Sequence, residues 1–344
     1  MNKSSNIIVG ISIGDLNGIG IEVILKAFAD KRMLEFCTPV LFGSSKVISF
    51  HKKALEIQTH IHGINTIDKV VHGKINLFNI WNEELKIELG VASKELGKYA
   101  FMSMEKAVNA LKDNKIHVLV TAPINKDTIQ SEEFKFPGHT EYLQSNLKGK
   151  SLMILMNDQL RIGLLTGHIP VSEVANSITP ELIEEKVAIM YQSLVQDFGI
   201  TKPKIAVLGL NPHSGDNGLI GQEEKEIIAP TVTKIRDTGK LIFGPYAADG
   251  FFGSKTYEQF DGVLAMYHDQ GLAPFKALSF GAGVNFTAGL QKIRTSPDHG
   301  TGFDIAGKNK ANADSFKEAL FTAIKIYKKR EEHLEMTKNV LKTS

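Results

Sequence analysis

The chain has 344 residues, 42% of them apolar, which is enough to fill one large or two ordinary hydrophobic cores. Its 40 Lys and Arg residues nearly balance its 38 Asp and Glu residues, and the net charge of +2 gives no electrostatic reason to expect a nucleic-acid or membrane partner. The single cysteine, Cys37, excludes an intrachain disulfide and is expected to be a small buried hydrophobe. The apolar run at 7–13 is too short to span a membrane and lacks a cleavage site, so we expect a cytoplasmic protein.

Short apolar runs alternate with longer helical patterns along the chain. The runs predict strands at 7–13, 40–42, 117–121, 152–156, 162–165, 204–208, 262–266 and 284–287. The helical patterns predict helices at 21–29, 96–112, 180–198, 222–238 and 315–334, and Thr179-Pro180 is a typical helix start. Residues 50–90 carry little signal. This alternation predicts an α/β fold with a largely parallel sheet, and two domains, if present, would be joined by more than one crossing of the chain.

The connections after the predicted strands carry most of the chemistry. Polar, glycine-rich loops follow several strands, at residues 14–18, 122–126, 166–168, 211–215 and 267–271. Ligands of open α/β sheets bind at the carboxyl ends of the strands. We therefore expect these loops to converge on a binding site.

Three of these loops place a histidine shortly after a predicted strand: His168, His213 and His268. Each alone is better explained as a hydrogen-bonded loop histidine, but together they form a candidate metal site, because three neutral imidazoles leave open positions on a divalent ion. Asp249, in another loop, and Asp269 can orient such a ligand, or can serve as turn or helix-cap residues.

Two further segments suit an anion. Residues 136–141 predict a turn and then a helix, with Thr140 as its cap and His139 as an additional donor beside the free amides. The third histidine loop is followed by two cationic side chains and one amide side chain, and such groups commonly bind phosphate: Lys276, Asn285 and Arg294. Spacing alone does not show that these groups converge, and Lys126 is a weaker candidate that is better explained as a surface or packing lysine.

The glycines after the first predicted strand, at residues 14–20, do not have the spacing of a Rossmann fingerprint. Residues 18–23 instead resemble the Gly-Asp-Gly-Ile-Gly-Pro-Glu-Val turn of isocitrate and isopropylmalate dehydrogenases, with Ile21 in the proline position. Residues 298–307 resemble the adenine-binding loop of those enzymes, which bind NAD without the fingerprint. The resemblance implies that the cofactor-binding residues are His299, Gly300 and Asp304.

Several motifs together are similar to one family, the 4-hydroxythreonine-4-phosphate dehydrogenases. The similarity extends from about residue 8 to about residue 325, and is strongest in residues 120–126, 137–141, 209–215, 265–271 and 294–301. It implies an isocitrate/isopropylmalate-dehydrogenase-like fold, in which residues 1–344 form one catalytic unit of two α/β domains with the active site in the cleft between them. It also implies a homodimer with the site at the subunit interface.

The resemblance further implies roles for individual residues. His168, His213 and His268 match metal ligands, and the substrate-binding positions are His139, Thr140, Lys276, Asn285 and Arg294. The positions expected to take part in or maintain catalysis are Lys276, Asp249 and Asp269. The general base stays open between Lys276 and a metal-bound water.

The implied reaction is the oxidation of 4-phosphooxy-L-threonine by NAD or NADP, followed by decarboxylation to 3-amino-2-oxopropyl phosphate, in vitamin B6 biosynthesis. It would use one divalent metal per site: zinc, magnesium or cobalt. One alternative is a paralogous dehydrogenase of a 4-phosphorylated threonate or erythronate. Another is a phosphate acyltransferase of related fold, which does not need the three histidines. A nucleotide-sensing or scaffold protein with a relict site is the non-enzyme alternative.

Overall fold

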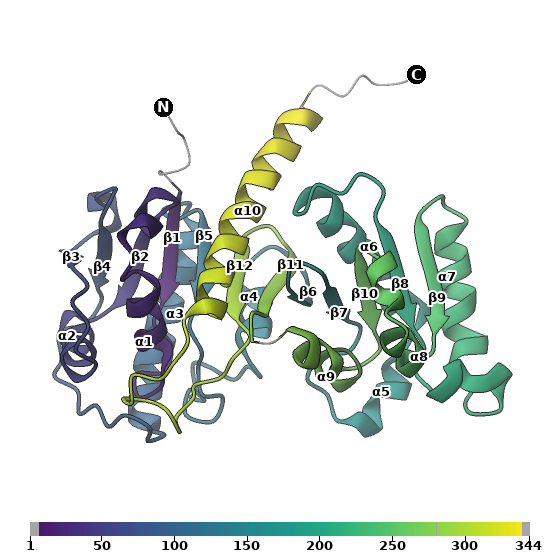
Figure 1. The fold of residues 1–344 in the computed structure, drawn as a ribbon, viewed down its shortest axis with the longest axis horizontal. Helices are drawn as coiled ribbons and strands as arrows, with labels where there is room; N and C mark the ends of the chain where they lie inside the picture. Colours follow the sequence, from purple (N-terminus) through teal and green to yellow (C-terminus); the bar gives the residue numbers. More distant parts are fainter. Residues whose placement is uncertain (1–6, 280, 339–344) are drawn as a thin grey trace. The chain divides into compact units, whose positions relative to one another are not determined.

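The computed structural model describes residues 7–279 and 281–338, shown as a ribbon in Figure 1. The chain divides into two compact units. Unit 1 comprises the residues up to 148 together with 291–327, and unit 2 comprises 149–290 together with the residues from 328 onward. The chain therefore leaves unit 1, returns to it, and leaves it again along the last helix.

Unit 1 contains a parallel sheet with the strand order β3-β4-β2-β1-β5-β12. Its strands are β1 (Ile8–Ser12), β2 (Thr38–Gly43), β3 (Ile61–Ile64), β4 (Ile75–Asn79), β5 (Val118–Thr121) and β12 (Ile293–Pro297). Its helices are α1 (Gly20–Ala27), α2 (Ser45–Ala54), α3 (Lys94–Lys112), α4 (His139–Asn146) and most of α10 (Asp314–Thr337), with 3-10 turns at Lys31–Glu35 and Ile67–Lys69. The central strands β1 and β5 are buried apolar runs, as expected for a parallel sheet covered on both faces.

Unit 2 contains a mixed sheet with the strand order β11-β6-β7-β10-β8-β9. Its strands are β6 (Gly149–Met156), β7 (Arg161–Leu164), β8 (Lys204–Leu208), β9 (Leu241–Tyr246), β10 (Gly262–Ala265) and β11 (Val284–Leu290). Strands β7, β10, β8 and β9 are parallel, whereas β6 is antiparallel to both of its neighbours. The helices are α5 (Val171–Ser177), α6 (Pro180–Gln196), α7 (Ala229–Arg236), α8 (Ala248–Gly253) and α9 (His268–Ser279), with shorter helical segments at Pro212–Gly218, Glu224–Ile228 and Thr256–Gln259.

Most of the predicted elements are present, with shifted ends. Thr179 caps α6 as predicted, because its hydroxyl accepts a hydrogen bond from the amide of Leu182 at 3.2 Å and Pro180 occupies the first turn. Cys37 is buried as predicted, and burial raises the pKa of its thiol to about 12. Among the described residues, no helix is both long and apolar enough to span a membrane.

Two segments that were predicted to be loops are helical. Residues 268–271 are not a loop, since α9 begins at His268 directly after the bend that follows β10. Asp249 likewise does not lie in a loop but in the first turn of α8. Both aspartate positions therefore lie close to a helix N-terminus, where the helix dipole stabilises a negative charge.

Candidate functional site

The three histidines follow three strands that are neighbours in the sheet of unit 2. His168 follows β7, His268 follows β10 and His213 follows β8, and β10 lies between the other two strands. The three strands are parallel, so their carboxyl ends meet at the same edge of the sheet. This topology gives a structural reason for the equivalent positions of the histidines in the sequence.

His168 and His268 lie side by side. Their ring centroids are 5.5 Å apart, and both residues line a pocket of about 340 Å³ together with Tyr267. Nδ1 of His268 lies 2.7 Å from Oδ1 of Asp269. A carboxylate on Nδ1 fixes the ring and makes Nε2 the nitrogen that can bind a ligand, so Asp269 has the orienting contact expected for it.

Hydrogen bonds connect the segments that carry the histidines. The hydroxyl of Thr166 donates to the carbonyl of Met266 at 2.7 Å. The side chain of Gln270 accepts from the amide of Met266 at 2.7 Å and donates to the carbonyl of Gly209 at 2.6 Å. Thr166 and Gln270 thus hold the ends of β7, β10 and β8 in register. Sequence reasoning missed both residues, although each lies in a loop that it singled out.

His213 lies in an unusual backbone segment. From His213 to Asn217 the φ angles are 51°, 54°, 78°, 43° and 57°, a left-handed run in which only Gly215 is free of a side-chain penalty. The carboxylate of Glu224 braces the start of this segment by accepting hydrogen bonds from the amides of Leu210 and Asn211 at 2.6 and 2.7 Å.

His213 itself is exposed and is not grouped with the other two histidines. Within 7–279 and 281–338, no cluster of three or more His, Cys, Asp or Glu side chains could hold a metal ion. The structure therefore brings His168 and His268 together, and it leaves His213 outside their pair.

The other candidates in unit 2 occupy different elements. Lys276 lies exposed on α9, and Asp249 is exposed on α8, after the edge strand β9. Asn285 lies on β11 opposite Leu155 of β6. Its Oδ1 is buried and has no hydrogen-bond partner in the described part of the chain. A buried acceptor of this kind costs free energy unless a ligand satisfies it, which suits a binding residue.

Arg294 is a deeply buried positive charge of unit 1. It lies on β12 beside Leu119 of β5 and is only 2% exposed. Its Nε and Nη2 donate to the hydroxyl of Thr121 at 3.0 and 2.6 Å. Burial lowers the pKa of the guanidinium to about 9, and the nearby charge of Glu141 opposes this shift. The group therefore keeps its positive charge at neutral pH.

His139 belongs to the same group as Arg294. Its Nε2 is buried without a hydrogen-bond partner among the described residues. Burial, and then the positive charges of Arg294 and Lys126, hold the pKa of His139 well below its usual value. Lys126, interpreted from the sequence as a surface or packing lysine, is thus close enough to act on this cluster. The three side chains form a locally positive environment suited to an anion.

The prediction that Thr140 caps the helix after the turn at residues 136–138 is wrong. Helix α4 begins at His139 after Gly138, and no side chain caps it. Thr140 is already inside the first turn, where a hydroxyl cannot take the place of the N-cap acceptor. The amides of this first turn remain the anion-binding feature that the sequence indicates.

The two segments that resemble dehydrogenase turns lie against each other in unit 1. The amide of Ile19 donates to the carbonyl of Thr301 at 2.9 Å. A Cβ at Gly18 would approach that carbonyl oxygen to 2.7 Å, so glycine is required for this contact. His299 and Gly300 precede the contact, and Asp304 is exposed in the turn after it. The cofactor-binding candidates thus share one short loop.

Comparison with known proteins decides the family. Residues 35–323 match the family model of the pyridoxal phosphate biosynthetic protein PdxA. A protein of Bacteroides thetaiotaomicron named 4-hydroxythreonine-4-phosphate dehydrogenase is 52% identical, over 96% of this chain and 91% of its own length. The chain belongs to the PdxA family. The resemblance inferred from the motifs is confirmed, and so is the prediction of an oxidoreductase.

Two solved structures support the fold expected for a PdxA protein. The crystal structure of 4-hydroxythreonine-4-phosphate dehydrogenase from Klebsiella pneumoniae has a TM-score of 0.79 at 32% identity, covering 94% of this chain and 99% of that one. Isocitrate dehydrogenase from Methylococcus capsulatus has a TM-score of 0.50 at 13% identity, covering 96% and 89%, which shows the fold alone. The predicted isocitrate/isopropylmalate-dehydrogenase-like fold class is confirmed.

PdxA relatives carry more than one name. A protein of Cupriavidus necator named D-threonate 4-phosphate dehydrogenase is 39% identical, over 91% of this chain and 95% of its own length. Both names describe dehydrogenases of phosphorylated compounds. Membership of this family therefore disfavours the acyltransferase and the relict scaffold, and it leaves 4-phosphooxy-L-threonine to be distinguished from a 4-phosphorylated threonate or erythronate.

Proposed function

We propose that this PdxA protein oxidises 4-phosphooxy-L-threonine with NAD or NADP and decarboxylates the product to 3-amino-2-oxopropyl phosphate, a step of vitamin B6 biosynthesis. The observation that carries the proposal is the 52% identity, over nearly the whole chain, to a relative named for this substrate. The buried cationic group around Arg294 supports it, because a phosphorylated substrate needs such a group.

The chemistry divides into two balanced steps. Hydride leaves the carbon that bears the hydroxyl and passes to the oxidised nicotinamide, while the hydroxyl proton passes to a base. The product is a 3-keto acid. Its carboxylate is β to the ketone and leaves as carbon dioxide, and the carbon left behind then takes up a proton. Lys276 and a bound water are the two bases that we consider.

We assign the phosphate to His139, Thr140 and Arg294, with Lys276 and Asn285 as further substrate ligands. His139 has a depressed pKa and is neutral at pH 7, so it can donate a hydrogen bond to phosphate without bringing a second buried charge. Arg294 supplies the positive charge and a planar fork of donors. Asn285 offers the buried amide oxygen that lacks a partner among the described residues.

We further propose that His168 and His268 hold a divalent metal ion. Their adjacent rings and the contact of Asp269 with His268 fit such an ion. Imidazole ligands favour zinc or cobalt, whereas magnesium prefers oxygen ligands. When bound, the ion would polarise the substrate oxygens as a Lewis acid.

The third ligand, His213, would then come from a second subunit of a homodimer. His213 is exposed, and on the same loop Leu219 is 81% and Ile220 40% exposed. Adjacent exposed apolar side chains beside an exposed ligand fit a contact with another copy of the chain better than they fit open solvent.

The proposal predicts turnover that depends on both substrate and metal. NADH or NADPH should form with 4-phosphooxy-L-threonine, and a chelator should abolish this formation until zinc or cobalt is restored. We expect a kcat/KM about tenfold or more higher than with 4-phospho-D-threonate, since a site built for an amine rejects an analogue that lacks it. A preference for the threonate would assign the chain to the activity for which the Cupriavidus necator relative is named.

A second prediction concerns the phosphate contacts. Replacing Arg294 by lysine keeps a positive charge and loses the planar fork that also bonds to Thr121. Loss of one charge-assisted hydrogen bond costs about 1.5–3 kcal/mol, so the substrate KM should rise by about tenfold to a hundredfold. Steady-state kinetics with saturating cofactor measures this change.

Arg161 offers a matched control. It is another arginine whose pKa is lowered mainly by burial, and it stacks on the ring of Phe198 at 4.6 Å in unit 2. Arg161→Lys should therefore disturb the packing of a partly buried arginine without changing the substrate KM. Equal effects of the two substitutions, or an unchanged KM in Arg294→Lys, would remove Arg294 from the phosphate site.

A further inference from the structure

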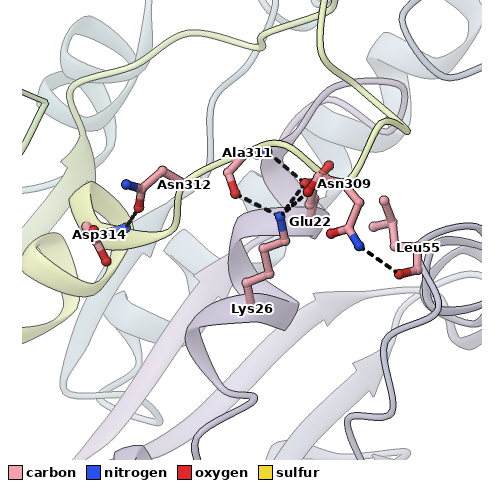
Figure 2. Close-up of polar contacts among 7 residues, drawn as sticks. All are labelled: Glu22, Lys26, Leu55, Asn309, Ala311, Asn312 and Asp314. Atoms are coloured by element: carbon pink, nitrogen blue, oxygen red, sulfur yellow. Dashed lines mark hydrogen bonds and ion pairs between the residues drawn. The ribbon is translucent and has the colours of Figure 1, made fainter.

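The loop that carries the cofactor-binding candidates has no regular secondary structure of its own. It runs from the end of β12 at Pro297 to the start of α10 at Asp314. Its internal backbone hydrogen bonds are turns, such as those from Ile305 to Gly302 and from Lys308 to Ile305. The conformation of this loop must therefore be fixed largely by contacts with other elements, and Figure 2 shows those made near its C-terminal end, around Asn309 and Ala311.

Lys26 makes the most extensive of these contacts. Its ammonium donates to the carbonyl oxygens of Asn309 and Ala311 at 3.0 and 2.9 Å, and to the carboxylate of Glu22 at 2.8 Å (Figure 2). An ammonium has three protons, and here three acceptors surround it. Lys26 is thus a specific clamp on the loop and more than an exposed surface charge.

Glu22 is the buried partner of Lys26 in these contacts with the loop. Its side chain is only 1% exposed, and Oε1 accepts hydrogen bonds from Lys26 and from the backbone amide of Ala311 at 2.9 Å. Oε2 is buried and lacks a hydrogen-bond partner in the described residues. A buried carboxylate with hydrogen bonds to only one of its oxygens contributes little to the free energy of unfolding. Its position instead fits a role in fixing the geometry of the loop.

The N-terminal end and one side of α1 contact the two ends of the segment 301–311. Ile19 is the N-cap of α1 and uses its backbone amide, whereas Glu22 and Lys26 are spaced i and i+4, which places their side chains on one side of the helix. Ile19 binds the carbonyl of Thr301, and the other two bind the segment around Ala311. Contacts with α1 and its N-cap therefore hold the segment that contains Asp304 at both of its ends.

We propose that Glu22 and Lys26 are positioning residues for the dinucleotide: they hold the 301–311 segment in its binding conformation before the cofactor arrives. The inference rests on the proposed function, since it assumes that this loop binds NAD or NADP. A loop that is already ordered loses less conformational entropy on binding. The clamp therefore contributes to cofactor affinity and leaves the reacting atoms untouched.

The test uses the full-length protein with Glu22→Gln and Lys26→Met. Glutamine keeps an oxygen for the Ala311 amide and loses the charge that attracts Lys26, while methionine keeps the apolar stem of the lysine. Calorimetric titration with NAD and, separately, NADP gives the dissociation constants. Hydrogen exchange of the amides of 301–311 reports on the loop directly. Lys317→Met, which removes an exposed ion pair with Asp314 in the same unit, is the control.

We expect either variant to weaken dinucleotide binding by about tenfold and to speed exchange in 301–311, with kcat at saturating cofactor and the KM of the phosphorylated substrate changed by less than about twofold. The control should match the wild type. Lys26 is partly exposed, so Lys26→Met keeps the test valid if Glu22→Gln folds poorly.

Three results would overturn the inference. Wild-type affinity or wild-type exchange in folded Lys26→Met would show that the clamp does not order the loop for the cofactor. A parallel loss of kcat and of phosphorylated-substrate binding would show general damage. Absence of NAD and NADP binding to the wild-type protein would refute the proposed function together with the inference, and this result is recognised before any variant is measured.

Discussion

His268→Ala is expected to lose most of its bound divalent metal and to lower kcat/KM by at least about a hundredfold while the protein stays folded. His268 begins α9, its ring lies beside that of His168, and Asp269 holds its Nδ1. Removal of this ring leaves one imidazole of the pair, which cannot retain an ion at the same affinity. Metal content per chain, measured after dialysis, and circular dichroism test the two halves of the expectation.

Two matched variants make this result specific. Asp269→Asn keeps both imidazoles and weakens only the partner of Nδ1, so its metal affinity should fall by about tenfold to a hundredfold, less than in His268→Ala. His60→Ala removes an exposed histidine of unit 1 and should change neither metal content nor kcat/KM. Full metal content in His268→Ala would exclude the ion from this pair of histidines.

Most of the strands that sequence patterns predicted contain a continuous buried apolar run. Strands β5 and β8 are of this kind. The missed strands lack such runs for identifiable reasons: β3 is a half-exposed edge strand, β4 buries Asn76, and β9 contains Gly244-Pro245. Strand β12 was missed because it buries Arg294, Thr295 and Ser296. The proposed anion-binding position accounts for Arg294, and such sites commonly violate local patterning, whereas the hydroxyl of Thr295 donates to the carbonyl of Ala319.

The residues of the candidate site also divide into those that the sequence predicted and those that it did not. Equivalent positions after successive strands were enough to predict that His168 and His268 approach each other. The left-handed backbone at His213 was not predictable, because only one of its five residues is glycine and the conformation depends on the distant brace from Glu224. Gln270 was missed for a related reason. Its side chain bonds to the carbonyl of Gly209, 61 residues away in sequence, and no local pattern reports such a contact. Lys126 was only a weaker candidate, because its electrostatic effect on His139 does not follow from the sequence.

Mixing of inactive variants is expected to restore activity in one combination and not in another. If the third ligand comes from the partner subunit, a mixed dimer of His213→Ala and His268→Ala chains has one intact site, because both substitutions fall in the other site. Random exchange makes about half of the dimers mixed, with one of two sites restored in each, so up to about a quarter of wild-type activity should return.

The structure supplies the matched combination that must fail. His168 and His268 lie side by side in one chain, so a mixture of His168→Ala with His268→Ala leaves a defect in every site and should recover no activity. Subunit exchange is verified in both mixtures by mass spectrometry of differently labelled chains. Recovery in both mixtures would place His168 and His268 in different sites. Recovery in neither, despite complete exchange, would place His213 in the same subunit as the other two, and the left-handed segment that carries it would then have to fold back toward the 340 Å³ pocket.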